Sequence, residues 1–335
     1  MAVGLASGLV ALTLGAGVFA ADSPALTTLA QASLRPPACR EHQGSAGSNL
    51  WPRTASGTER SYCDLLARAQ ARLEQTPDRA FELAEQARPG LPGQAAPLVV
   101  QARALVRKGE WARADRLFAQ ALAAKDPPFG DPAVLRELAL TTAIAGRRAE
   151  AIALYRKLIP RADYRRDPSF RRVVVLEAAS LLGAAGPDGA REAEAYLSEA
   201  RRGERAPGLD DLTSAFLALE LERRGDAEQA RVVARELPGP WGLERFLSQA
   251  DQQRLERVVL ATEGAPAVPI APVFRARSPL FLDGELHAVL AVAAGERDPR
   301  AMKSHLEAYL DGPGASGPWA AWARAKLGSP RGGRR

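Results

Sequence analysis

Histidine and cysteine supply most metal ligands and many catalytic groups, and this chain of 335 residues has only three of the first and two of the second. No His-Glu-x-x-His, Cys-x-x-Cys or Gly-x-Ser-x-Gly motif occurs, and no phosphate-binding loop ends in Gly-Lys. Enzymatic chemistry of these common kinds is therefore not indicated. We expect no catalytic residue, no cofactor and no metal ion.

Two histidines near the C-terminus leave one alternative open. His287 and His305 fall on two successive expected helices, where a metal site is geometrically conceivable. No cysteine lies near them in the sequence. The favoured interpretation is that His305 takes the place of an aromatic core residue, and that His287 packs or faces water.

Strand patterns are missing as well. Val and Ile are sparse, and no alternation of apolar and polar residues continues beyond a few positions. Helix formers such as Ala, Leu, Arg and Glu dominate most segments. Because 46% of the residues are hydrophobic and 25% are charged, the chain has the composition of a folded protein. The predicted fold class is all-α.

Lysine is scarce, so the net charge of +6 comes almost entirely from arginine. An excess of positive charge is consistent with an anionic partner such as an acidic peptide, a membrane surface or a nucleic acid. However, Arg alternates with Glu and Asp along nearly every expected helix, as in a G+C-rich genome that favours Arg codons. No basic block contains interleaved aromatic residues, so we expect no specific nucleic-acid binding.

The N-terminal residues 2–21 carry no charge and end in Val18-Phe19-Ala20-Ala21. Short side chains at Val18 and Ala20 suit signal-peptidase cleavage after Ala20, although no Lys or Arg precedes the apolar run. Residues 1–21 are therefore predicted to be a signal peptide of a periplasmic or secreted bacterial protein. The alternative is an uncleaved anchor that faces the protein towards the periplasm, because about twenty apolar residues can span a bilayer.

Residues 22–60 are rich in Ser, Pro, Thr and Gly and show no periodicity, which predicts an irregular leader. Cys39 lies within this leader, and Cys63 lies at the start of the first expected helix, Tyr62–Glu74. An even number of cysteines in an exported protein favours a disulfide, which would contribute about 3 kcal/mol by restricting the unfolded chain. Two unpaired thiols are the alternative.

Two stretches between residues 97 and 160 repeat one pattern. Each has a small residue within its first helix, a Gly at the turn, and a small residue followed four positions later by an aromatic in its second helix. The equivalent positions are Ala102, Gly109, Ala114 and Phe118 in one stretch, and Ala139, Gly146, Ala151 and Tyr155 in the other. Small residues let two helices cross closely, and Gly permits a left-handed residue where the first helix ends.

This pattern resembles the tetratricopeptide repeat (TPR). The small residue of the second helix recurs at Ala80, Ala114, Ala151, Ala193 and Ala230. The first step, of 34 residues, equals the tetratricopeptide period, and insertions in turns lengthen the others. The resemblance covers residues 61–237 and is weaker in the first and fourth units, which lack the turn Gly. It implies an α-solenoid of antiparallel helix pairs, a TPR-like superhelix, with about five to seven pairs in the whole chain.

Beyond the repeats, Pro238-Gly239-Pro240 stops the last unit. Asp298-Pro299 is a typical helix start, with Asp as the cap and Pro at the first helical position. Trp319 and Trp322 are expected to cover the apolar end of the array. The expected segments are a helix with a Pro-rich connector (238–280), a repeat-like pair and a capping helix (281–328), and a basic tail (329–335).

In tetratricopeptide domains the first helices of successive units line a groove that binds an extended peptide or a segment of another protein. Carried across by position, the resemblance implies a groove lined by Val99, Arg103, Val106, Arg107, Arg136, Leu140, Leu219 and Arg223. Arg103, Arg107 and Arg136 could bind a carboxylate with paired hydrogen bonds. The Lys and Asn residues of members that bind C-terminal carboxylates are absent at these positions. Solvated surface arginines are the alternative interpretation.

Together these features predict a non-catalytic scaffold or adaptor in the cell envelope or periplasm. Its expected partner is a protein or an extended peptide segment, and an acidic segment would suit the arginines. Contact with a membrane is expected only through an uncleaved N-terminal segment. The alternatives are a helical accessory module of an envelope enzyme or of a glycan- or peptide-processing complex, and a structural spacer without a specific ligand.

Overall fold

A computed structural model describes residues 39, 57–124, 131–161, 167–204, 209–237, 283–295 and 297–328. These residues form thirteen α-helices, two short 3-10 helices and no strand, which confirms the all-α prediction. The predicted signal peptide, the Pro-rich connector and the basic tail lie outside the described residues, as does the leader apart from Cys39 and residues 57–60. Among the described helices, none has the length and apolar character needed to cross a bilayer.

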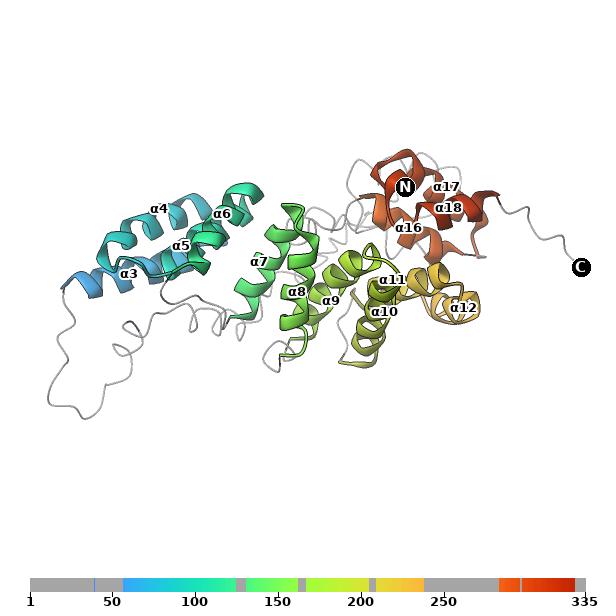
Figure 1. The fold of residues 1–335 in the computed structure, drawn as a ribbon, viewed down its shortest axis with the longest axis horizontal. Coiled ribbons are helices and arrows are strands. Elements are labelled where there is room, and N and C mark those ends of the chain that lie inside the picture. The colour runs from blue at the N-terminus through green and yellow to red at the C-terminus, as the bar shows by residue number, and fades with distance from the viewer. Residues whose placement is uncertain are drawn as a thin grey trace, which may run out of the picture.

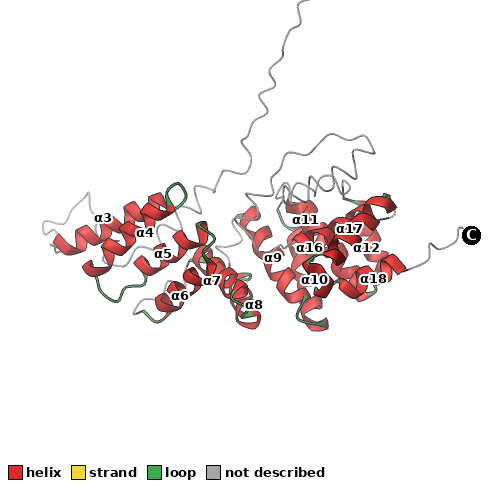
Figure 2. Ribbon diagram, turned by 90° about the horizontal axis from the view of Figure 1, so that it is seen from above, coloured by secondary structure: helices red, strands yellow, loops and turns green. Residues whose placement is uncertain are grey.

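The helices follow one another along an elongated molecule, from α3 at one end to α18 at the other (Figures 1 and 2). The first helix of each pair packs mainly against the second, and α4, α6, α8 and α10 also pack against the first helix of the next pair. The α-helices are α3 (Gly57–Arg72), α4 (Pro77–Ala87), α5 (Ala96–Arg107), α6 (Trp111–Leu122), α7 (Pro132–Ile144), α8 (Arg148–Leu158), α9 (Pro168–Gly183), α10 (Pro187–Arg202), α11 (Leu209–Arg224), α12 (Ala227–Arg235), α16 (Asp283–Ala294), α17 (Pro299–Asp311) and α18 (Ala320–Gly328).

Three helix pairs are closed by the same turn. Gly109, Gly146 and Gly225 have φ angles of 73°, 85° and 86°, in the left-handed region that disfavours residues with a side chain. After each Gly, a backbone N–H donates to a carbonyl five residues back, as in a Schellman motif: Glu110 to Leu105 (2.9 Å), Arg147 to Thr142 (3.1 Å) and Asp226 to Leu221 (3.0 Å). The α9–α10 turn differs, because Gly186 has φ 101° and ψ −172°.

The small residues expected where paired helices cross are buried. Ala80, Ala114, Ala151, Ala193 and Ala230 are at most 1% exposed. The repeat aromatics Phe118 and Tyr155 are also buried, at 2% and 1%, and belong to a core that continues from α5 to α18. A second cluster joins α3, α4 and α5. Because α5 contributes to both clusters, it connects the first helix pair to the rest of the molecule.

The C-terminal helices pack against the repeats. α16 begins at Asp283, and α17 begins after the expected cap Asp298, whose carboxylate accepts a hydrogen bond from the Ala301 N–H at 2.9 Å. α16 packs against α11. Trp319, just before α18, is fully buried and meets the Phe216 ring of α11 edge-on, with 6.2 Å between ring centroids. The C-terminal helices therefore share one core with α11.

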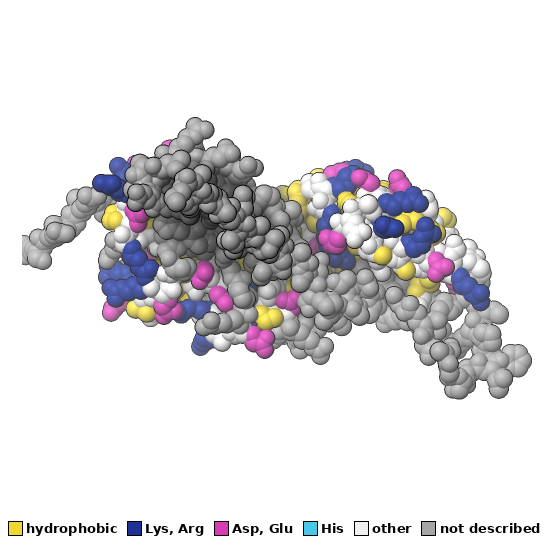
Figure 3. All heavy atoms as spheres, turned by 180° about the vertical axis from the view of Figure 1, so that it is seen from behind, with side chains coloured by type: hydrophobic (Ala, Val, Ile, Leu, Met, Phe, Trp, Pro, Cys, Tyr) yellow, Lys and Arg dark blue, Asp and Glu magenta, His cyan; other side chains and the backbone are white. Residues whose placement is uncertain are grey.

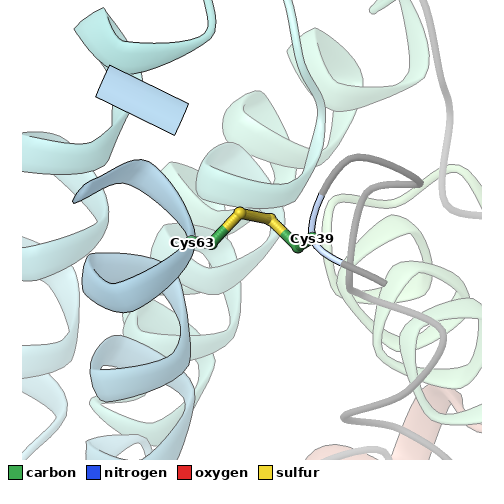
Figure 4. Close-up of a disulfide and its surroundings, with 2 residues drawn as sticks. All are labelled: Cys39 and Cys63. Atoms are coloured by element: carbon green, nitrogen blue, oxygen red, sulfur yellow. A yellow bond between two sulfur atoms is a disulfide. The ribbon is translucent and has the colours of Figure 1, made fainter. Parts of the chain in front are cut away.

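A disulfide joins Cys39 to Cys63 on α3, with 1.96 Å between the sulfur atoms and 5.6 Å between the Cα atoms (Figure 4). These are the two cysteines expected to pair. Cys39 is 7% exposed and belongs to the cluster that α3 forms with α4 and α5. α3 itself begins at Gly57, five residues before the expected start at Tyr62.

Candidate functional site

The apolar residues of the expected groove are packed inside the molecule. Val99, Val106, Leu140 and Leu219 are between 0% and 5% exposed, and Val99, Val106 and Leu219 belong to the continuous core. The reason is that α5 also packs against α7, and α9 against both α7 and α11. In this structure these positions make contacts between units and present no side chain to a ligand.

The arginines of α5 are bound to carboxylates of neighbouring units. Arg103 donates from Nε to Glu137 Oε2 at 2.8 Å, and Glu137 lies on α7. Arg107 donates to Glu137 at 2.5 Å and to Glu74, which follows α3, at 2.7 Å. Burial alone would raise the pKa of Glu137, but the charges of Arg103 and Arg107 outweigh burial and hold the pKa at about 2. Glu137 is therefore ionised, and Arg107 binds both Glu137 and Glu74, so these charges join three successive units.

The next unit boundary has the same arrangement. Arg136 on α7 makes two hydrogen bonds to Glu177 on α9, of 2.9 and 2.6 Å. Tyr155 donates its hydroxyl proton to the same carboxylate at 3.1 Å, and the Glu177 side chain is 0% exposed. The Arg136 guanidinium also lies 6.0 Å from the centre of the Phe170 ring. Arg136 is therefore held by protein groups on several sides.

A third boundary completes the series. Arg172 on α9 is 1% exposed and binds Asp210 on α11 at 2.9 Å and the Glu204 carbonyl at 3.1 Å. We call this series the first-helix ladder; it consists of Arg103, Arg107, Arg136 and Arg172 with Glu74, Glu137, Glu177 and Asp210. Its carboxylates were not among the residues predicted from the sequence. The signal was present, because Glu137, Glu177 and Asp210 each follow their arginine by about one repeat length.

A further row of ion pairs joins the second helices. Arg147 binds Asp115 at 2.7 Å, and Arg156 binds Glu192 at 2.5 Å. The two arginine side chains are 41% and 53% exposed, so each pair contributes little to stability. Like the ladder, this row joins equivalent helices of successive pairs, but its side chains are more exposed.

Arg223, the last residue of the expected groove, pairs with Glu220 of its own helix at 2.8 Å. The Glu220 side chain is 0% exposed and burial raises its pKa, which is a common property of catalytic carboxylates. A Cβ atom placed on Gly183 would lie 2.5 Å from Glu220 Oε1. Trp319 packs against the ring of Phe216, which lies one turn before Glu220 on α11. Because protein encloses this carboxylate completely, it does not reach a substrate.

The two C-terminal histidines face each other. His287 Nδ1 lies 3.2 Å from His305 Nδ1, so one ring donates a hydrogen bond and the other accepts it. The residues are 4% and 1% exposed. Burial, and next the charge of His287, lower the pKa of His305 to about 3. The described part of the chain holds no group of three or more potential metal ligands, and the histidines pack the α16–α17 pair.

Two pockets open on the N-terminal half. One, of 540 Å³, is lined by residues between Glu85 and Ala124 of α4, α5, α6 and the loop after α4. The other, of 370 Å³, lies between α3 and α4 and is lined by Arg68, Ala71, Arg72, Thr76, Arg79 and Leu83. Neither lining contains a His, Cys or Ser, so neither pocket holds the usual pair of nucleophile and base. Both linings contain charged and apolar side chains.

Comparison of the chain with protein-family models, with curated proteins and with solved structures found no match. The resemblance to the tetratricopeptide repeat therefore depends on this chain's own residues. They are the turn glycines, the buried alanines and the buried aromatics that recur from unit to unit.

Proposed function

We propose that this protein is a non-catalytic scaffold or adaptor, built as a TPR-like α-solenoid of antiparallel helix pairs, that binds a protein or an extended peptide segment. The observation that carries the proposal is the first-helix ladder. It uses buried charged groups to fix one helix pair against the next. A rigid array of this kind presents a long surface at which a partner segment becomes ordered on binding.

The ladder also supports a non-catalytic role. Glu137 and Glu177 are buried carboxylates of the kind that enzymes use. However, Glu137 is bonded to two arginines, and Glu177 to Arg136 and Tyr155. Fully bonded carboxylates of this kind hold structure together and have no open side for a substrate. The partner would therefore be recognised by exposed side chains, with little rearrangement of the array.

A location in the bacterial envelope is part of the proposal. The disulfide between Cys39 and Cys63 supports it, because disulfides persist in oxidising compartments such as the periplasm. The uncharged residues 2–21 supply a signal peptide or, alternatively, an anchor facing the periplasm. Mass spectrometry of the protein from separated envelope and cytoplasmic fractions tests this point. A mature N-terminus at Ala21 is expected, and a full-length chain found only in the cytoplasm would contradict it.

The scaffold proposal is tested by crosslinking the full chain in its native envelope, and by reconstituting it with each protein recovered. We expect one stoichiometric partner that binds the purified chain and stays bound in about 0.5 M salt, where exposed charges are largely screened. Binding that disappears completely on adding salt would reduce the interaction to non-specific attraction. An enzyme partner whose turnover rises on addition of the chain would favour the accessory-module alternative.

A further inference from the structure

The pocket between α3 and α4 concentrates positive charge on a concave surface. Arg68 and Arg72 line it from α3, and Arg79 from α4. Ala71 and Leu83 supply its apolar part. In the space-filling view, Lys and Arg side chains gather around an apolar hollow over the end of the molecule formed by α3 and α4 (Figure 3). We call this feature the α3–α4 arginine pocket.

These arginines differ from those of the ladder. Arg68 and Arg72 are exposed, and neither makes an ion pair or hydrogen bond with another described residue. They are four residues apart on one helix face, where like charges repel each other. Arg79 binds Glu82 at 2.7 Å, but the two side chains are 49% and 59% exposed, so solvent weakens this pair. Three guanidinium groups are thus available without breaking a buried contact.

We propose that the α3–α4 arginine pocket binds an acidic peptide segment of a partner protein through the segment's Asp and Glu carboxylates. This inference rests on the proposed scaffold function and names the chemistry of its partner. A guanidinium can bind a carboxylate with two parallel hydrogen bonds, and Leu83 and Ala71 provide contact for the segment's apolar atoms. The 370 Å³ volume is at the lower end of ligand pockets, which suits a few side chains.

Other occupants fit the surface less well. The chain's own segment 22–56 has no acidic block, because it contains Asp22 and Glu41 against Arg35, Arg40 and Arg53. An anionic membrane would meet two further exposed carboxylates on α4. Their side chains are 77% exposed for Asp78 and 59% for Glu82. A narrow acidic segment can enter between such groups, whereas a flat anionic surface is repelled by them.

The test measures binding of a fluorescein-labelled hexaglutamate peptide to the full chain by fluorescence anisotropy in about 0.05 M salt, where charge interactions are weakly screened. The variant is Arg68→Glu/Arg72→Glu. The matched control is Arg116→Glu/Arg148→Glu, which changes the net charge equally at two exposed arginines that also lack an ion pair among the described residues. All four positions are exposed, so circular dichroism should show unchanged helicity.

We expect the dissociation constant to rise about tenfold or more in the pocket variant and less than about threefold in the control. Equal losses in both variants, or no binding to the wild type, would overturn the inference. So would sedimentation with phosphatidylserine vesicles that the pocket variant abolishes while hexaglutamate binding stays unchanged. The hexaglutamate measurement tests only the pocket proposal. Recovery of an envelope partner by both variants would keep the scaffold proposal even if the pocket failed.

Discussion

The first-helix ladder makes a quantitative prediction at Glu137. Replacing Glu137 with Gln removes the negative charge that Arg103 and Arg107 share, and leaves two cationic groups without their common partner. The shape of the side chain is kept, so the change is mainly electrostatic. The Glu137 side chain is 6% exposed, so water compensates little for the loss.

The size of the effect follows from the pKa of Glu137, which is about 2 against an ordinary value of 4.5. At about 1.4 kcal/mol for each pH unit, this shift corresponds to about 3 kcal/mol of stability at pH 7. Removing one partner from a buried ion pair typically costs about 3–5 kcal/mol, which agrees. We therefore expect Glu137→Gln to lower the free energy of unfolding by about 3 kcal/mol.

The pH dependence gives an independent check with a defined sign. The folded state holds Glu137 ionised more strongly than the unfolded state does. Its contribution is therefore complete above pH 4.5 and is lost as the pH falls towards 2. The Glu137→Gln variant should lack this part of the acid-induced loss of stability.

Urea unfolding followed by circular dichroism measures the change, and hydrogen exchange locates it, because repeat arrays can open locally. The matched control is Glu150→Gln. Glu150 is 65% exposed and binds Arg147 at 3.1 Å, so we expect a change below about 0.5 kcal/mol. A Glu137→Gln effect below about 1 kcal/mol, or exchange that rises equally in α7 and α17, would refute the structural role given to the ladder.

Three further predictions concern the core and the turns. The pKa of His305 is about 3 in the folded state and 6.5 in the unfolded state. The free energy of unfolding should therefore fall by about 2 kcal/mol as the pH is lowered from 6.5 to 5. Hydrogen exchange in α16 and α17 would measure this fall, and an equal fall in His305→Phe would contradict the prediction. Gly146→Ala should lower the free energy of unfolding by about 1–2 kcal/mol through its left-handed backbone alone, since nothing lies within 4 Å of the new Cβ. Thermal unfolding measures the change. Gly57→Ala is the control, because its Cβ also enters open space and its backbone is not left-handed. Ala114 is 0% exposed, so Ala114→Trp should overpack the core and lower the free energy of unfolding by about 3 kcal/mol or more. An unchanged melting temperature would contradict the assignment of Ala114 to the small-residue position of the repeat.

The elements that the sequence predicted correctly depend on local rules. Gly109 and Gly146 were identifiable because a left-handed residue closes such a turn, and both have positive φ. Asp298 was identifiable because Asp before Pro caps a helix start. Each rule involves a few neighbouring residues, so one sequence is sufficient to apply it.

The groove residues could not be predicted in the same way. The burial of Val99 and Leu140 depends on how closely one first helix packs against the next, and helical periodicity does not determine that distance. Likewise, Arg136 pairs with a carboxylate 41 residues away. A spacing of about one repeat length permits such a pair but does not determine whether the arginine faces the carboxylate or solvent. The contact of Trp319 with Phe216 also joins segments that no local rule connects.

The net charge of the chain is therefore a poor guide to its binding surface. The ladder neutralises Arg103, Arg107 and Arg136 inside the array, and the second-helix pairs neutralise others on its exterior. A partner contacts the exposed arginines that have no ion pair among the described residues, and Arg68 and Arg72 are two of these that line one concave site. If the array is a scaffold, substitutions in the ladder should change its stability, whereas substitutions in the α3–α4 arginine pocket should change partner affinity at constant stability. An effect of both sets on stability alone would leave the pocket without a binding role.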